Sequence, residues 1–254
     1  MNDNVTVSED DFQAFVQYAR VLGFATITTQ QLTGFLYHNE RIPPRSMLMI
    51  VDDKRPGTVE THFLPVLEHY DWTVTLGWII AGTDDALWQR MEKLYATGRL
   101  DVQSHGYQHQ YITEFMPEDQ VRQEIFDPIP VLEAHFGKQP LAFIWPGGNF
   151  TVQSVQMARQ AGYQLGFTAS SRGPLLFNWI PQGDAERAAK DPLMLLPRGW
   201  STALGVNLDV AVQVGEQALV FAIKQYPEEA VYYRTYCGGE LPALDTVIQA
   251  TPLP

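Results

Sequence analysis

Hydrophobic and polar positions alternate along this chain in short blocks, and the blocks predict strands and helices in turn. Short runs rich in Val, Ile and Leu are typical of strands buried in a parallel sheet, whereas apolar residues three or four positions apart are typical of helices with one buried face. The predicted strands are residues 25–27, 47–51, 74–80, 100–102, 141–145, 165–169, 194–196 and 230–236. The predicted helices are residues 8–22, 28–38, 59–69, 84–97, 117–135, 151–161 and 209–225.

This alternation indicates an α/β fold in which helices cover a parallel sheet. Six or seven strand–helix units predict a barrel with fewer units than the usual eight. Pro128 and Pro130 are expected to kink or split the helix that contains them. Residues 171–192 are rich in Gly, Pro, Asn and Asp and predict a long loop. Since a chain of 254 residues can bury one large core, we expect a single domain over residues 1–254.

The composition is that of a soluble globular protein, with 45% hydrophobic and 18% charged residues. No apolar run reaches about 18 residues, so we expect no membrane span. The first residues, Met1 to Asn4, lack the basic and apolar regions of a secretory signal. Two locations therefore stay open: a cytoplasmic protein, or an exported protein whose signal has been removed.

The charge of the chain restricts its partners. A formal net charge of -12 argues against nucleic acid and anionic membranes, because binding phosphate groups requires clustered Lys and Arg. A neutral or cationic partner such as a glycan fits better. The single cysteine, Cys237, rules out an internal disulfide and a cysteine-based zinc site, and we expect it to be a packed residue.

Three polar stretches follow predicted buried strands. The first contains the adjacent carboxylates Asp52 and Asp53, and the second contains the imidazoles of His105 and His109, four residues apart. The third is the turn at residues 146–148, Pro-Gly-Gly. Because the carboxyl ends of parallel strands meet at one edge of a sheet, we expect the three stretches to lie close together.

The side chains in these stretches suit metal-assisted hydrolysis. A carboxylate and two histidines form a typical catalytic zinc set with an open fourth position. Two carboxylates in one site rarely have the same role, because mutual repulsion separates their pKa values, so the second is free to act as a base. A backbone N–H in the glycine turn would stabilise a developing oxyanion by about 3–4 kcal/mol if it is aimed correctly. Each feature alone also has a plain structural interpretation: a polar turn, a packed histidine or a tight turn.

The order and content of the three stretches resemble the polysaccharide deacetylase family, also called carbohydrate esterase family 4 or the NodB-homology domain. The family motifs Thr-Phe-Asp-Asp-Gly, His-Ser/Thr-x-x-His and Arg-x-Pro-Tyr/Phe-Gly read here as residues 50–54, 105–109 and 144–148. The flanking stretches 12–36 and 161–168 are also similar to the family, so that the resemblance covers about residues 8–200. It is closest to the biofilm-type poly-N-acetylglucosamine deacetylases.

The resemblance implies a distorted (β/α)7 TIM-like barrel that holds one divalent metal ion. Zinc is the expected ion, with cobalt, nickel or manganese as alternatives. Asp53, His105 and His109 would be the metal ligands, and Asp52 would be the general base for a metal-bound water that attacks an N-acetyl carbonyl. The N–H of Gly147 would stabilise the oxyanion.

The catalytic arginine of the third family motif is replaced here. Ile144 stands at its position, and we expect Arg198, at the end of a later predicted strand, to contact Asp52 in its place.

Three further departures from the family pattern affect the expected chemistry. Lys54 replaces the glycine after the Asp pair and adds a cation beside the base. Gly106 replaces the Ser or Thr that normally braces the metal loop. No histidine follows His135, so the usual late general-acid histidine has no candidate.

Aromatic residues near the predicted strand ends are candidates for a glycan groove, since sugar rings stack on such side chains; the alternative is that they pack the barrel mouth. These residues are Tyr107, Trp145, Phe150, Trp179 and Trp200, and the predicted substrate contacts are Tyr107, Trp145, Pro146 and Trp200.

We therefore predict a metal-dependent polysaccharide N-deacetylase acting on poly-N-acetylglucosamine, a chitin-like glycan or peptidoglycan. Two alternatives stay open: a catalytically degenerate glycan-binding module of the same fold, and an amidohydrolase of a small non-sugar amide. The resemblance implies an extracellular or cell-envelope location, and a cytoplasmic location stays open. Residues 201–254 lie outside the resemblance and are expected to complete or flank the barrel with a helix and a strand.

Overall fold

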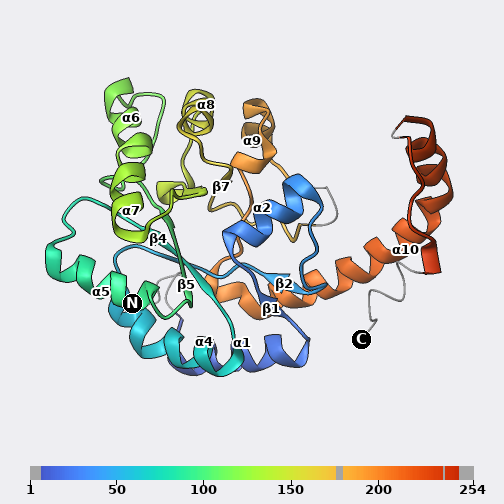
Figure 1. The fold of residues 1–254 in the computed structure, drawn as a ribbon, viewed down its shortest axis with the longest axis horizontal. Helices are drawn as coiled ribbons and strands as arrows, with labels where there is room; N and C mark the ends of the chain where they lie inside the picture. Colours follow the sequence, from blue (N-terminus) through green and yellow to red (C-terminus); the bar gives the residue numbers. More distant parts are fainter. Residues whose placement is uncertain (1–6, 176–179, 237, 246–254) are drawn as a thin grey trace.

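A computed structural model describes residues 7–175, 180–236 and 238–245. Its centre is a parallel sheet of five strands in the order β3-β4-β5-β6-β7, and a parallel pair, β1 and β2, leads into this sheet (Figure 1). The strands are β1 Ala25–Thr26, β2 Ser46–Met47, β3 Ile50–Asp52, β4 Val74–Trp78, β5 Leu100–Ser104, β6 Ala142–Ile144 and β7 Leu165–Phe167. The predicted α/β class is therefore confirmed, and the curled sheet of five parallel strands is consistent with the predicted distorted (β/α)7 TIM-like barrel.

Helices connect successive strands and surround the sheet (Figure 1). The α-helices are α1 Glu9–Val21, α2 Thr29–His38, α3 Pro56–Thr58, α4 Leu64–Tyr70, α5 Asp85–Tyr95, α6 Glu118–Phe126, α7 Pro128–Phe136, α8 Val152–Ala161, α9 Asp184–Ala189 and α10 Leu204–Tyr236. A π-helical segment, η1 Val59–Phe63, joins α3 to α4, and short 3-10 turns are η2 Pro146–Gly148, η3 Pro192–Met194 and η4 Ser201–Ala203. The predicted split of the helix at Pro128 is present between α6 and α7.

Side chains at the helix starts explain several of these boundaries. The hydroxyl of Ser8 accepts the N–H of Asp11 at the start of α1. Thr28 and Gln31 form a capping box at α2, in which each side chain bonds the backbone of the other residue. Such caps satisfy N–H groups that have no partner inside the helix.

The strand pairing of the sheet is shortest between β5 and β6, where only Ser104 and Phe143 are paired. Next to this pair, the side chain of Gln103 accepts the N–H of Ala142 at 2.8 Å and so replaces a backbone bond. The amide of Gln103 also donates to the carboxylate of Asp101, a buried group that accepts further bonds from Thr29. A polar network inside the barrel therefore ties β5 to β6 and to the start of α2.

The predicted final strand, Ala230 to Tyr236, is wrong. These residues continue α10, which also begins earlier than the predicted helix 209–225. Their β-branched and aromatic composition favours a strand only where a neighbouring strand can pair with it. Figure 1 shows this half of α10 projecting away from the sheet, so a strand there would have no partner among the described residues.

Two predictions in the region after β7 need correction. Residues 194–196 do not form a full strand: the turn η3 ends at Met194, and only Leu196 forms a bridge, to Phe167. Residues 171–192 are not a loop throughout, because α9 occupies residues 184–189. The polar composition of this region concealed a helix of only six residues.

The helical stretch Ser201–Thr235 is long and apolar enough to cross a membrane by length and composition alone. This finding differs from the expectation of no membrane span. A single helix of this kind is weak evidence for a membrane span. The start of α10 packs on the protein body: Leu208 is buried in the main hydrophobic cluster, and Tyr18 donates a hydrogen bond to Asp209 of α10.

Candidate metal centre

The three predicted stretches meet at the carboxyl ends of the parallel strands. Asp52 is the last residue of β3, His105 directly follows β5, and Pro146 begins the turn η2 after β6. Parallel strands place their carboxyl ends at one edge of the sheet, and loops at this edge commonly form the active sites of α/β proteins.

One carboxylate and two imidazoles converge at this edge. Oδ1 of Asp53 lies 3.9 Å from Nε2 of His105 and 3.8 Å from Nε2 of His109. One ligand atom from each of the three residues lies within 4.8 Å of the other two. This is the predicted ligand set, and its nitrogen and oxygen donors are those that a catalytic zinc site uses.

Left-handed backbone conformations bring these side chains together. Asp53 has φ 69° and His109 has φ 65°, both values that non-glycine residues rarely adopt. In a regular strand Asp52 and Asp53 would point to opposite faces. The turn at Asp53 allows both carboxylates to approach His105, whose Nε2 also lies 3.9 Å from Oδ2 of Asp52.

The tautomer of His105 suits a metal ligand. Its Nδ1 lies 2.8 Å from the carbonyl oxygen of Ile144, so an Nδ1–H donates to this carbonyl and Nε2 presents a lone pair to the site. Burial lowers the pKa of His105, against the opposing attraction of Asp52, and this favours the neutral imidazole that binds metals. The donor set and the orientation of His105 therefore fit a divalent cation.

Asp52 is held by Arg198, as the sequence predicts. Nη1 of Arg198 lies 3.0 and 2.8 Å from the two carboxylate oxygens of Asp52, and its Nε donates to the carbonyl of Thr168. Burial alone would raise the pKa of Asp52, but Arg198 foremost lowers it overall through its positive charge and its hydrogen bonds. Asp52 is therefore an ionised carboxylate with a fixed orientation beside the candidate metal ligands.

Glu124 of α6 holds the loop between the two histidines, and the sequence analysis missed it. Its carboxylate accepts the backbone N–H groups of Tyr107, Gln108 and His109 at 2.9, 2.9 and 3.1 Å. Burial raises its pKa, and the bonds from the backbone N–H groups oppose this shift. The only signal in the sequence is a glutamate on the apolar face of a predicted helix.

The ring of Tyr111 lies against the glycine turn after β6, a contact that the sequence does not predict. Gly147 has φ 60°, and a Cβ added there would lie 2.8 Å from the ring of Tyr111. The same ring lies edge-on to His109, with ring centroids 5.8 Å apart. Tyr111 is 58% exposed, so its ring borders the site between a predicted metal ligand and the predicted oxyanion donor.

Lys54 does not point toward Asp52. Its ammonium group donates to the carbonyl of Ala81 in the loop after β4, so the predicted cation beside the base is directed away from it. Arg55 instead lies near the candidate metal ligands, with Nη2 3.4 Å from Oδ2 of Asp53.

The predicted substrate contacts have different environments. Trp145 is fully buried and donates from Nε1 to the carbonyl of Met194, so its ring is not available for stacking on a sugar. Pro146 is also buried, Tyr107 packs partly against the main hydrophobic cluster, and Trp200 is 44% exposed. Phe150 packs near Trp145, while Trp179 and Cys237 lie outside the described residues.

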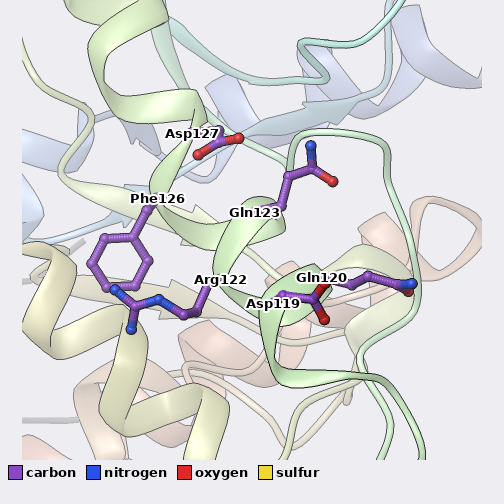
Figure 2. A pocket seen from close by; sticks show the side chains of 6 residues that line it. All are labelled: Asp119, Gln120, Arg122, Gln123, Phe126 and Asp127. Atoms are coloured by element: carbon purple, nitrogen blue, oxygen red, sulfur yellow. The ribbon is translucent and has the colours of Figure 1, made fainter.

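A separate surface hollow lies on the outer side of α6 (Figure 2). It is lined by Asp119, Gln120, Arg122, Gln123, Phe126 and Asp127. None of the predicted site residues borders it, and all of its lining comes from α6 and the residue that follows it.

Comparisons with known proteins agree with this geometry. A family model described as polysaccharide deacetylase matches residues 40–166. The chain is 22% identical over 168 residues to YxkH of Bacillus subtilis, a protein assigned to the polysaccharide deacetylases. This match covers 65% of the chain, and the chain spans only 60% of the length of this curated relative.

Solved structures of deacetylases have the same fold. The deacetylase PplD of Streptococcus pyogenes, in complex with acetate, superposes with a TM-score of 0.66 at 20% identity, covering 82% of this chain and 88% of PplD. IcaB of Ammonifex degensii superposes with a TM-score of 0.60 at 21% identity, covering 84% of this chain and 90% of IcaB.

Proposed function

This chain belongs to the polysaccharide deacetylase family, and on that premise we propose that it is a metal-dependent hydrolase that removes N-acetyl groups from a glycan. The observation that carries the proposal is the convergence of Asp53, His105 and His109 at the carboxyl edge of the sheet, beside the separately held carboxylate of Asp52. The proposed substrates are poly-N-acetylglucosamine, chitin-like glycans or peptidoglycan.

Each polar group of the site has a defined task in this proposal. A divalent cation bound by Asp53, His105 and His109 would supply a Lewis acid and lower the pKa of water to about 7. Asp52 accepts the proton of the water that attacks the amide carbonyl, because it is ionised and does not belong to the ligand set. Arg198 holds this carboxylate in place through both of its oxygens.

Gly147 supports the negative charge that develops on the carbonyl oxygen. Its N–H precedes the first hydrogen bond of η2, which Gly148 donates to the carbonyl of Trp145 at 2.8 Å. Such a donor contributes most when it faces the developing oxyanion in a site from which water is excluded. Tyr111 covers this glycine on one side and would limit the access of water.

The position of the aromatic residues limits how a glycan would bind. Trp200 and Tyr111 expose 44% and 58% of their surfaces and are the proposed stacking platforms for sugar rings. Trp145 is excluded from this role by its burial.

The first test is acetate release from N-acetylglucosamine oligomers by metal-stripped protein, with and without added zinc or cobalt. We expect release only after metal is added. Protein that binds the metal but releases no acetate would favour a glycan-binding module or a different amide substrate. Protein that binds no metal would refute the proposal.

A further inference from the structure

We propose that Glu124 is a positioning residue for the metal centre: its buried carboxylate shapes the loop of residues 106–110 so that His109 faces Asp53 and His105. This inference rests on the proposed function, because it takes these three residues as the metal ligands. Glu124 belongs to a different element, α6, and contacts the loop only through backbone N–H groups.

Three successive N–H groups of the loop point at one carboxylate. Oε2 of Glu124 accepts from Tyr107 at 2.9 Å and from His109 at 3.1 Å, while Oε1 accepts from Gln108 at 2.9 Å. Successive N–H groups converge in this way only when the backbone curls around the acceptor, a concave arrangement that binds anions. Hydrogen bonds to an ionised acceptor are about twice as strong as neutral ones.

The position of Glu124 determines where His109 lies. One of the three N–H groups belongs to His109 itself, and this residue has the uncommon φ of 65°. A left-handed residue of this kind persists only where its surroundings hold it. The bond from the His109 N–H therefore helps to maintain the conformation that directs its ring toward Asp53.

Gly106 leaves room for the carboxylate. It has φ 87°, and a Cβ added there would overlap Oε2 of Glu124. The family normally has Ser or Thr at this position to brace the loop. In this chain Glu124 braces the loop, and a side chain at residue 106 would displace its carboxylate.

α6 has a buried face that carries Glu124 and an exposed face, so the role of Glu124 can be tested separately from the stability of the helix. Val121, Glu124 and Ile125 form the buried face, and Glu124 is only 1% exposed. Gln120 and Gln123 lie on the other face, where Figure 2 shows them lining the surface hollow. Burying a carboxylate costs free energy unless hydrogen bonds satisfy it. An apolar side chain at residue 124 would therefore suffice if α6 needed only apolar packing.

The test compares Glu124→Gln with the matched control Gln123→Ala on the outer face of the same helix. Glutamine has the size of glutamate but replaces one acceptor oxygen with an NH2 group, which would face a backbone N–H. We expect the affinity for zinc, measured by chelator competition on folded protein, to fall roughly 10- to 100-fold in Glu124→Gln and to stay unchanged in Gln123→Ala.

The visible absorption spectrum of the cobalt-loaded protein supplies a second readout, because it reports the geometry of the ligands. We expect it to change in Glu124→Gln. Gly106→Ala retains Glu124 but places a methyl group against its carboxylate, and we expect the same two effects. This variant keeps the inference testable if Glu124→Gln does not fold.

The outcomes separate this inference from the proposed function. Wild-type protein that binds no metal would overturn both. Wild-type protein that binds metal, together with a folded Glu124→Gln or Gly106→Ala variant of equal affinity and unchanged cobalt spectrum, would overturn only the role of Glu124.

Discussion

Asp52 and Asp53 are neighbours in the chain but have different partners. Asp53 lies 3.8 Å from His109 within the candidate ligand set. The two carboxylate oxygens of Asp52 instead accept hydrogen bonds from Arg198. Repulsion between two unpaired carboxylates would raise one pKa. The positive charge and hydrogen bonds of Arg198 instead stabilise the ionised form of Asp52.

This division predicts different results from substituting each residue. Asp53→Ala and His105→Ala should lose the metal, because each removes one of three ligands. Asp52→Asn should keep the metal, which elemental analysis would show, and lose about 10²- to 10⁴-fold in kcat, the usual contribution of a general base. Undiminished turnover in Asp52→Asn would refute the assignment of the base.

Gly147 is constrained in two ways. Its φ of 60° costs about 1–2 kcal/mol for a residue with a side chain, and a Cβ there would overlap the ring of Tyr111. We expect Gly147→Ala to lower kcat/KM by roughly tenfold or more, since 1.4 kcal/mol of transition-state stabilisation corresponds to a factor of ten.

A double-mutant cycle with Tyr111→Ala separates the two constraints on Gly147. Removing the ring abolishes the overlap but not the backbone strain. The loss caused by Gly147→Ala should therefore be smaller in the Tyr111→Ala background than in wild type. Equal losses in both backgrounds would show that Tyr111 does not restrict the turn.

At the scale of elements, the pattern of apolar residues predicts the strands that carry the site. The predicted strands 47–51 and 100–102 end one and two residues before β3 and β5 end, and apolar runs of this kind are typical of buried parallel strands. The same reasoning misplaces α10 and misses α9. Residues 230–236 have strand-like composition but no strand to pair with, and a six-residue helix has too few positions to show a period.

The side chain of Gln103 compensates for the sparse backbone pairing between β5 and β6. Its side chain is fully buried and accepts the N–H of Ala142. This hydrogen bond stands in for one that the backbone of β5 does not supply to β6. Gln103→Ala should destabilise the protein by about 2–3 kcal/mol, because it leaves buried polar groups without partners. Urea unfolding would measure this loss, with Gln123→Ala on the surface as control. A free energy of unfolding equal to that of wild type would show that water or a neighbouring group replaces the amide.

At the scale of the whole molecule, the sequence predicts which stretches meet but not what supports them. Parallel topology brings Asp53 and His105 to one edge, and this follows from the order of strands. Glu124 and Tyr111 reach the site through contacts with a loop and a glycine turn, and these depend on backbone angles that no residue spacing encodes. The contact of Arg198 with Asp52 was expected because Ile144 stands at the position of the family arginine and Arg198 follows predicted strand 194–196, of which only Leu196 forms a bridge.

The net charge of the molecule predicts how it interacts with the proposed product, a deacetylated glycan. Removal of acetyl groups converts a neutral glycan into a cationic one, and the protein carries a formal net charge of -12. The long-range attraction between them is screened by salt, since the Debye length falls from about 30 Å at 0.01 M to about 3 Å at 1 M ionic strength.

Inhibition of acetate release by glucosamine oligomers should therefore weaken several-fold between these two salt concentrations. The KM for the neutral N-acetylglucosamine oligomer should change little over the same range, and it serves as the internal control. The cations nearest the site do not oppose this trend, because Arg198 is paired with Asp52 and Arg55 lies beside Asp53. If salt leaves the inhibition constant unchanged, the product is retained by short-range contacts in the groove and the overall charge of the protein has no part in its release.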